Sequence, residues 1–148
     1  MNIRRFTEND ADEASKLICT TLMKVNTKDS PLFAIKEQCS EYSPEEIKKL
    51  SKKREIFVAI EKNKIIGTAA IDRDYIGSVF VDSSNLKKGI GSKLMNYVES
   101  IARKKGYKEV VLRSSPTAFG FYKKLGYKEV KREYQRNQLT MIEMKKIL

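Results

Sequence analysis

Three short apolar runs between residues 55 and 81 constrain the fold of this chain most. They read EIFVAI (55–60), IIGTAAI (65–71) and IGSVFV (76–81), and only four residues separate each run from the next. Runs of this length that are rich in β-branched residues are typical of strands. Connections of four residues, the first with Asn63 near its centre, permit hairpins but no crossover. The segment therefore predicts an antiparallel meander.

The hydrophobic period changes after this meander. From Ile90 to Ala102 the apolar residues recur on one helical face, basic residues fill the last turn, and Gly106 suits the left-handed end of a helix. Residues 109–114 then predict another strand, and residues 117–126 predict a short helix. A final pair of strands is predicted by two alternating segments, YKEVKREYQ and LTMIEMKKI.

The N-terminal part predicts one strand followed by helices. Residues 2–6 form a short strand candidate, and a helix with an acidic first turn follows it. Residues 26–42 are less regular and predict a loop or a second helical piece. A further helix starts at Ser43, because Pro44 suits the first helical position and Glu46 completes a capping box.

Composition excludes several classes of protein. The chain contains no His, which excludes Ser-His-Asp and Cys-His nucleophile systems and His-ligated zinc, and we expect no metal site. Cys19 and Cys39 form no CxxC pattern, and two free thiols in a reducing compartment are favoured over one disulfide. The length of 148 residues suits one domain, and no repeat or linker divides it.

The sequence also predicts a soluble, cytoplasmic protein without a membrane partner. No apolar run approaches the roughly 20 residues that a helix needs to span a bilayer. The N-terminal residues MNIRRFTEND contain no apolar core of a signal peptide.

The positive charge is concentrated in one half of the chain. Residues 1–86 contain 14 Lys and Arg and 14 Asp and Glu, whereas residues 87–148 contain 16 and 5, so the second part carries the whole net charge of +11. Solvated helix faces are one interpretation and explain most of these lysines. The alternative is that this half of the chain faces an anionic partner, for which nucleic acid and a phosphorylated cofactor are the candidates.

Two glycines, Gly89 and Gly91, open the long helix in the segment LKKGIGSKL (86–94). A helix N-terminus has free N–H groups, and glycines let a phosphate approach the backbone. The pattern is not a P-loop, because SK follows Gly91, and a third glycine of a dinucleotide fingerprint would fall at Leu94. A phosphate cradle is one interpretation, and a helix cap without a ligand is the other.

Two motifs follow one another in the second half of the chain, SSNLKKGIGSKL and AFGFYKKLGY. Their order resembles the GNAT family of acetyl-coenzyme A-dependent N-acetyltransferases, whose motifs read Q/R-x-x-G-x-G/A and A-x-x-F-Y-x-K-L-G-F/Y. The matches to the first motif are Leu86, Lys87, Lys88, Gly89, Ile90 and Gly91. The matches to the second motif are Ala118, Phe121, Tyr122, Lys124, Leu125, Gly126 and Tyr127.

The resemblance implies a fold and an activity. The fold is a single α/β (α+β) domain with a mixed, mostly antiparallel sheet of six to seven strands, flanked by helices on both faces. The activity is an acyltransferase that moves an acetyl group from acetyl-CoA to a primary amine by direct attack in a ternary complex. Residues 1–54 would form the substrate side, and residues 55–148 would form the acetyl-CoA-binding core.

The resemblance also implies roles for individual residues. Tyr122 would be the general acid for the departing thiolate, and a backbone N–H near Phe80 or Val81 would stabilise the oxyanion. Lys124 would add positive charge near the cofactor. The residues expected to bind the cofactor are Val79, Phe80, Val81, Lys87, Lys88, Gly89, Ile90, Gly91, Ser92, Ser115 and Lys123.

Two features depart from the family pattern. Leu86 replaces the usual Gln or Arg at the start of the loop, so backbone N–H groups would make most of the phosphate contacts. Family members often carry a Glu general base on the strand equivalent to residues 75–81, and this strand contains no acid. Asp72 and Asp74 lie just before the strand, and the general base stays unassigned.

Alternatives remain open at this point. The acceptor amine can belong to a small molecule or to a protein N-terminus or lysine side chain. An alternative of a different class is a basic nucleic-acid-binding module, although the chain lacks interleaved aromatic residues and any known motif of that kind. We therefore expect no specific nucleic-acid partner, and a homodimer stays open.

Overall fold

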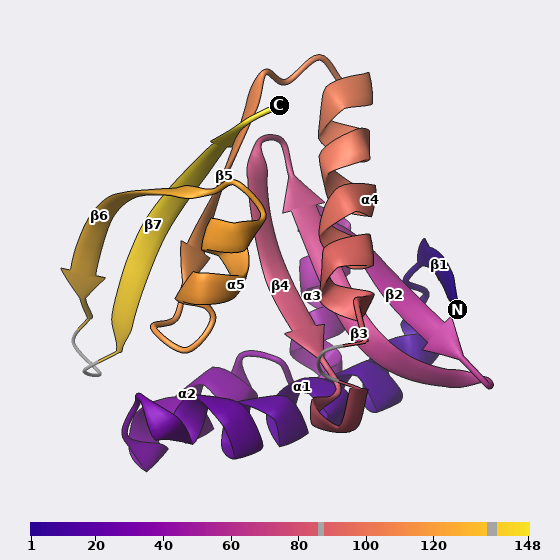
Figure 1. Ribbon diagram of the computed structural model, residues 1–148. Coiled ribbons are helices and arrows are strands. Elements are labelled where there is room, and N and C mark those ends of the chain that lie inside the picture. Colours follow the sequence, from indigo (N-terminus) through magenta and orange to yellow (C-terminus); the bar gives the residue numbers. More distant parts are fainter. Residues whose placement is uncertain (86–87, 136–138) are drawn as a thin grey trace.

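The computed structural model describes residues 1–85, 88–135 and 139–148, and in these residues seven strands form one sheet (Figure 1). Their order across the sheet is β1-β2-β3-β4-β5-β7-β6, and every neighbouring pair is antiparallel except β4 and β5. The strands are β1 Asn2–Arg5, β2 Glu55–Glu61, β3 Lys64–Asp72, β4 Tyr75–Val81, β5 Glu109–Ser114, β6 Lys128–Tyr134 and β7 Thr140–Ile147. The sheet confirms the predicted fold class, including the antiparallel meander of β2, β3 and β4.

Helices cover both faces of this sheet. Figure 1 shows α4 in front of the sheet and α3 behind it. The helices are α1 Ala11–Val25, α2 Leu32–Ser40, α3 Pro44–Lys53, α4 Ile90–Lys104 and α5 Phe119–Lys124. Three 3₁₀ turns complete the described elements, η1 Glu8–Asp10, η2 Asn26–Lys28 and η3 Ser83–Asn85.

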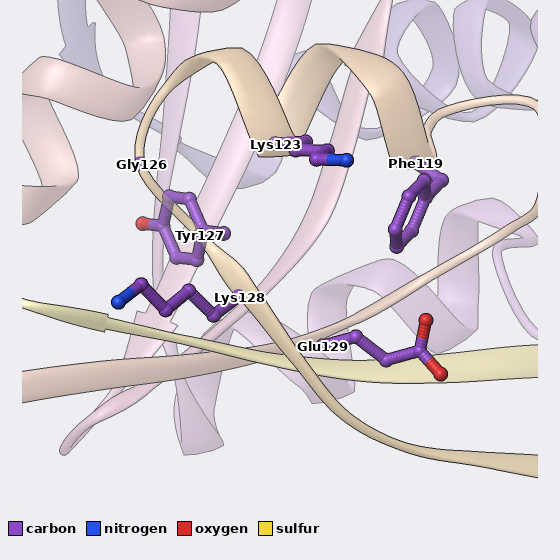
Figure 2. Close-up of a pocket in the computed structure, with 6 residues that line it drawn as sticks. All are labelled: Phe119, Lys123, Gly126, Tyr127, Lys128 and Glu129. Carbon is purple, nitrogen blue, oxygen red and sulfur yellow. The ribbon is translucent and has the colours of Figure 1, made fainter.

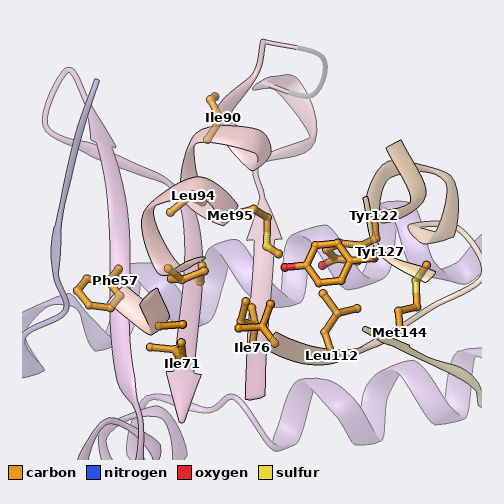
Figure 3. Packing of buried hydrophobic residues seen from close by; sticks show 14 of the residues in the cluster. Phe57, Ile71, Ile76, Ile90, Leu94, Met95, Leu112, Tyr122, Tyr127 and Met144 are labelled. Carbon is orange, nitrogen blue, oxygen red and sulfur yellow. The ribbon is translucent and has the colours of Figure 1, made fainter. Parts of the chain in front are cut away.

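Two apolar clusters fill the space between the sheet and its helices. On the α4 side, Leu94, Met95 and Val98 are fully buried against the sheet (Figure 3). On the other side, Ile18 of α1 and Ile47 of α3 are buried in a second cluster. Each such side chain stabilises the fold by about 1.5–3 kcal/mol relative to exposure. We call the α4 side the front of the sheet and the α1–α3 side the rear.

Local sequence signals explain the ends of several elements. Lys62 and Asn63 both have positive φ angles, 51° and 63°, as a two-residue hairpin turn requires. The irregular stretch 26–42 contains α2, so it includes the second helical piece. The Ser43 Oγ accepts from the Glu46 N–H at 3.2 Å, whereas the Glu46 carboxylate pairs with Lys49, so only half of the predicted capping box forms.

The parallel pair β4–β5 separates soon after it begins. The two strands are paired only at Tyr75 with Val111 and at Ile76 with Leu112. Beyond this point β4 contains an irregularity, because Ser78 has a left-handed φ of 52° and the register with β3 shifts. The Thr68 hydroxyl donates to the Ser78 carbonyl at 2.7 Å and stabilises this conformation. Residues 77–81 therefore lie outside the β4–β5 ladder.

Two further predictions can be compared with the structure. Cys19 of α1 and Cys39 of α2 are both free thiols, as predicted, and burial raises the pKa of the Cys19 thiol to about 12. Among the described residues, no helix is both long enough and apolar enough to cross a membrane.

Candidate active site

The N-terminus of α4 lies directly beyond the end of β4. The Asp82 N–H donates to the Ile66 carbonyl at 2.9 Å, and the Asp82 carboxylate accepts from the Ser84 N–H at 3.1 Å, which holds the turn η3. Helix α4 then begins at Ile90 with Gly89 as its N-cap, in the left-handed conformation with φ 78°. The first N–H groups of the helix have no intrahelical acceptor, so they are available to an anion.

The two glycines of this segment answer different structural needs. A Cβ on Gly89 would meet no atom within 4 Å, so glycine is required there by its φ angle and leaves the backbone uncovered. A Cβ on Gly91 would lie 2.9 Å from Cζ of Phe121, so glycine is required there for the packing of α5 on α4. A substitution at Gly91 would therefore disturb α5 as well as any ligand at the helix start.

The structure places most of the predicted cofactor-binding residues of β4 and α4 along one path on the front, but it places the Phe80 side chain on the rear. Val79 and Val81 pack against the front cluster, whereas Phe80 packs against the rear cluster. Ile90 and Ser92 lie in the first turn of α4.

The predicted lysines are less uniformly placed. Lys88 is exposed, and its Nζ lies 3.4 Å from Oδ1 of Asn85. Lys123 and Lys124 are exposed in the last turn of α5. Leu86 and Lys87 lie outside the described residues, so their predicted roles have no structural counterpart here.

Tyr122 is buried where α5 packs against α4 and the sheet. Its ring makes an edge contact with Tyr127, with ring centroids 5.9 Å apart, and Figure 3 shows the two rings beside each other. The Tyr127 hydroxyl donates to Oε2 of Glu99 at 2.7 Å, and Lys146 Nζ lies 2.9 Å from Oε1 of that carboxylate. This buried network fixes α5, and with it Tyr122, on α4.

The Tyr122 hydroxyl is protonated and makes no hydrogen bond to a described residue. Burial raises the pKa of Tyr122 well above its ordinary value, and Tyr75 adds to this effect, so the phenol keeps its proton at neutral pH. Within the described part of the chain the hydroxyl makes no hydrogen bond. In the same residues, every side-chain oxygen or nitrogen that is fully inaccessible has a hydrogen-bond partner. The oxygen of Tyr122 is therefore not completely inaccessible, and its O–H is free to donate to a ligand.

A polar cluster lies on the rear of β4. The Tyr42 hydroxyl is 3.0 Å from Oγ of Ser78, and Nη1 of Arg54 donates to the same oxygen at 3.4 Å. Burial raises the pKa of Tyr42, so this phenol also stays protonated. Sequence reasoning missed this cluster, because Tyr42 and Arg54 lie 36 and 24 residues before Ser78 and the three residues belong to no motif.

Ser115 has a local structural partner. Its Oγ accepts from the Ala118 N–H at 3.3 Å, which holds the loop before α5. The neighbouring Thr117 N–H donates to Oδ2 of Asp29 at 2.8 Å and ties this loop to the segment after α1. The predicted contact between Ser115 and a cofactor remains a prediction.

The acids before β4 lie at the end of the strand that is far from α4's N-terminus. Asp72 pairs with Arg73 at 3.3 Å in the turn before β4, and the Asp74 carbonyl accepts from the Val111 N–H at 2.9 Å. Both acids are therefore at the paired end of β4 and β5, so the structure assigns neither as the base. Among the described residues, no group of three His, Cys, Asp or Glu side chains could hold a metal ion.

A separate cavity of about 460 Å³ lies between α5 and the start of β6 (Figure 2). It contains Lys123 but neither Tyr122 nor any residue of α4, so it is distinct from the path along the front. Its lining residues are Phe119, Lys123, Gly126, Tyr127, Lys128 and Glu129.

Comparisons with known proteins identify the family. The model of a family described as an acetyltransferase (GNAT) domain matches residues 24–148. An uncharacterised N-acetyltransferase from Chlorobaculum tepidum is 35% identical over 86 residues, which cover 55% of this chain and 54% of the relative. The alignment thus spans about half the length of that curated relative.

Solved structures share the fold over the whole chain. A GCN5-related N-acetyltransferase from Rhodopseudomonas palustris has a TM-score of 0.92 at 16% identity, covering 99% of this chain and 95% of that chain. The PaiA N-acetyltransferase from Thermoplasma acidophilum, in complex with coenzyme A, has a TM-score of 0.80 at 20% identity, covering 99% and 98%. At these identities the likeness shows the fold.

The chain belongs to the GNAT acetyltransferase family, because the family match covers most of its length. The predicted class, an acyltransferase, is confirmed at the level of the family.

Proposed function

We propose that the protein transfers an acetyl group from acetyl-CoA to a primary amine by direct attack in a ternary complex. One observation carries the proposal. A glycine-led helix N-terminus follows the stretch where β4 leaves β5, and α5, which packs on this helix through Phe121 and Gly91, carries the protonated Tyr122 hydroxyl without a described hydrogen-bond partner. A cytoplasmic location stays a prediction.

The residues at the start of α4 fit the diphosphate of coenzyme A. The uncovered backbone at Gly89 and the free N–H groups of the first turn offer donors to phosphate oxygens. The exposed Lys88 adds positive charge, and residues 87–148 carry the whole net charge of the chain. Residues 79–81, outside the β4–β5 ladder, are proposed to pair with the pantetheine arm.

The proposed chemistry assigns one step to Tyr122. Acetyl-CoA supplies the acetyl group as a thioester, and the amine nitrogen forms the new C–N bond while the C–S bond breaks. The Tyr122 hydroxyl donates its proton to the departing thiolate and regains one from solvent, and the amine proton leaves to water. A backbone N–H near Phe80 or Val81 is proposed to stabilise the negative charge on the carbonyl oxygen.

Thermal unfolding with and without acetyl-CoA tests the proposal. A ligand that binds only the folded state stabilises it by about 2.7 kcal/mol at 100 times its dissociation constant, so the midpoint should rise clearly. Pantetheine, which lacks the diphosphate, is the matched control and should raise the midpoint much less. A chain that binds duplex DNA in a salt-dependent way, and shows no shift with millimolar acetyl-CoA, would instead be a nucleic-acid-binding module.

A further inference from the structure

Arg54 is a half-buried arginine whose charge is not neutralised by a described carboxylate. Its contacts within the described residues are the Ser78 Oγ, 3.4 Å from Nη1, and the ring of Tyr75, whose centroid lies 5.5 Å from Cζ. Five other described arginines pair with a carboxylate; they are Arg4, Arg5, Arg73, Arg103 and Arg132. The remaining described arginine, Arg113, has no such partner but is exposed to water. A guanidinium removed from water normally has such a partner, so its absence indicates a place for an anionic ligand.

The chain holds this guanidinium in place on the rear of β4. The Arg54 N–H donates to the Leu50 carbonyl at 2.9 Å, which fixes the residue at the end of α3. A Cβ on Gly77 would lie 3.0 Å from Nη1 of Arg54 and 2.9 Å from Cε1 of Tyr75, so glycine at this position makes room for the stacked pair. Contacts with α3 and the sheet therefore fix the position of this charge, unlike that of a freely moving surface side chain.

Two hydroxyl groups stand beside the guanidinium. Ser78 turns its Oγ to the rear through its left-handed backbone, and Tyr42 reaches the same oxygen from the loop before α3. The ring of Tyr42 packs against Phe80, with centroids 5.4 Å apart, which fixes the direction of its hydroxyl. Arg54, Ser78 and Tyr42 thus combine one positive charge with O–H donors, which is the donor set that a carboxylate requires.

We propose that the acceptor is a small molecule that carries a carboxylate beside its amine, and that Arg54 binds this carboxylate with the help of Ser78 and Tyr42. The inference rests on the proposed function. The cluster lies on β4 just past the last β4–β5 pair, so an amine attached to a bound carboxylate is directed toward the stretch where the two strands separate. An acceptor that carries only ammonium groups would be repelled by the unpaired guanidinium.

Paired acceptors test the assignment directly. The value of kcat/KM is measured for a panel of α-amino acids and for their α-carboxamides, which keep the amine and lose the carboxylate charge. We expect the wild-type enzyme to prefer at least one acid over its amide by tenfold or more. In Arg54→Gln this ratio should fall to near one through a raised KM for the acid, and Arg54→Lys should restore part of it. Arg73→Gln, which removes an exposed guanidinium, should leave the ratio unchanged.

Three results with the small-molecule panel would overturn the inference. They are a wild-type preference for the amides, a preference for acids that survives Arg54→Gln, and no acetylation of any acid in the panel by a protein that acetyl-CoA stabilises. Each of these results leaves the acetyltransferase assignment intact, because cofactor binding is read separately by the thermal shift. Acetylation of peptide N-termini or lysine side chains in preference to every amino acid would likewise replace the small carboxylate acceptor by a protein.

Discussion

The front and the rear of β4 are built in different ways. On the front, the groups that can meet a ligand are mainly backbone N–H groups at the start of α4, which have no intrahelical acceptor and follow a glycine without a side chain. On the rear, they are the side chains of Tyr42, Arg54 and Ser78, brought together from three separate elements. A backbone site suits a ligand that every family member shares, whereas a side-chain site can vary with the acceptor.

The two sides also differ in how they are anchored. Tyr122 on the front depends on a buried network in which Glu99, 1% exposed, bonds both Tyr127 and Lys146. Ser78 on the rear depends on its left-handed backbone and on the Thr68 hydrogen bond. Substitutions on the front should therefore change cofactor binding and chemistry, and those on the rear should change acceptor binding.

The largest effect is expected from removing the Tyr122 hydroxyl. Tyr122→Phe keeps the ring in its apolar surroundings and removes only the proton donor, so kcat should fall by about 10²- to 10⁴-fold with little change in cofactor affinity. Tyr97→Phe is the matched control, because it removes a hydroxyl on the same face of the sheet. The Tyr97 ring packs on Phe57, with ring centroids 5.0 Å apart. A Tyr122→Phe enzyme within about threefold of wild type, with chemistry rate-limiting, would leave the thiolate to take its proton from water.

A smaller effect is expected from the glycine that opens α4. Gly89 and Gly106 stand at opposite ends of this helix, both with positive φ and both with no atom within 4 Å of a Cβ. An Ala at either position should lower the free energy of unfolding by a similar amount, about 1–2 kcal/mol. Only Gly89→Ala should also weaken acetyl-CoA binding, by about 10- to 100-fold, as the loss of charge-assisted hydrogen bonds predicts. Equal cofactor affinities in the two variants would show that the diphosphate does not bind at the start of α4.

A still smaller effect, on KM for the acceptor, is expected from a substitution on the rear. Tyr42→Phe removes the hydrogen bond to Ser78 and should raise KM for the acceptor by about two- to tenfold, the range of one neutral hydrogen bond. Cofactor affinity should not change, because Tyr42 lies on the other side of β4. Steady-state kinetics with each substrate varied in turn make this distinction. A change in KM for acetyl-CoA alone would contradict the division of the two sides.

The smallest effect is expected from Lys88. This side chain is exposed, so Lys88→Ala should weaken acetyl-CoA binding only a few-fold at low salt. The loss should shrink as ionic strength rises, since the Debye length falls to about 8 Å at 0.15 M. Binding isotherms at two salt concentrations measure both quantities. A loss that is independent of salt would indicate a direct contact in place of a field effect.

The contrast between the two sides explains what the sequence could and could not predict. The meander, α4 and the start of α4 follow from local patterns, and the motif residues of the front are contiguous in the chain. The left-handed Ser78 has no local signal, because serine seldom adopts that conformation. The contact of Phe121 with the Gly91 position and the meeting of Arg54 with Ser78 arise only when distant elements pack together.

The division of β4 into a cofactor side and an acceptor side is tested most directly by nuclear magnetic resonance on ¹⁵N-labelled protein during a titration with coenzyme A. We predict that the amide signals of Gly89, Gly91, Ser92 and residues 79–81 shift, while the side-chain Nε–Hε signal of Arg54 stays in place. Shifts that gather instead around the cavity of Phe119, Lys128 and Glu129, with the α4 amides unmoved, would contradict the account.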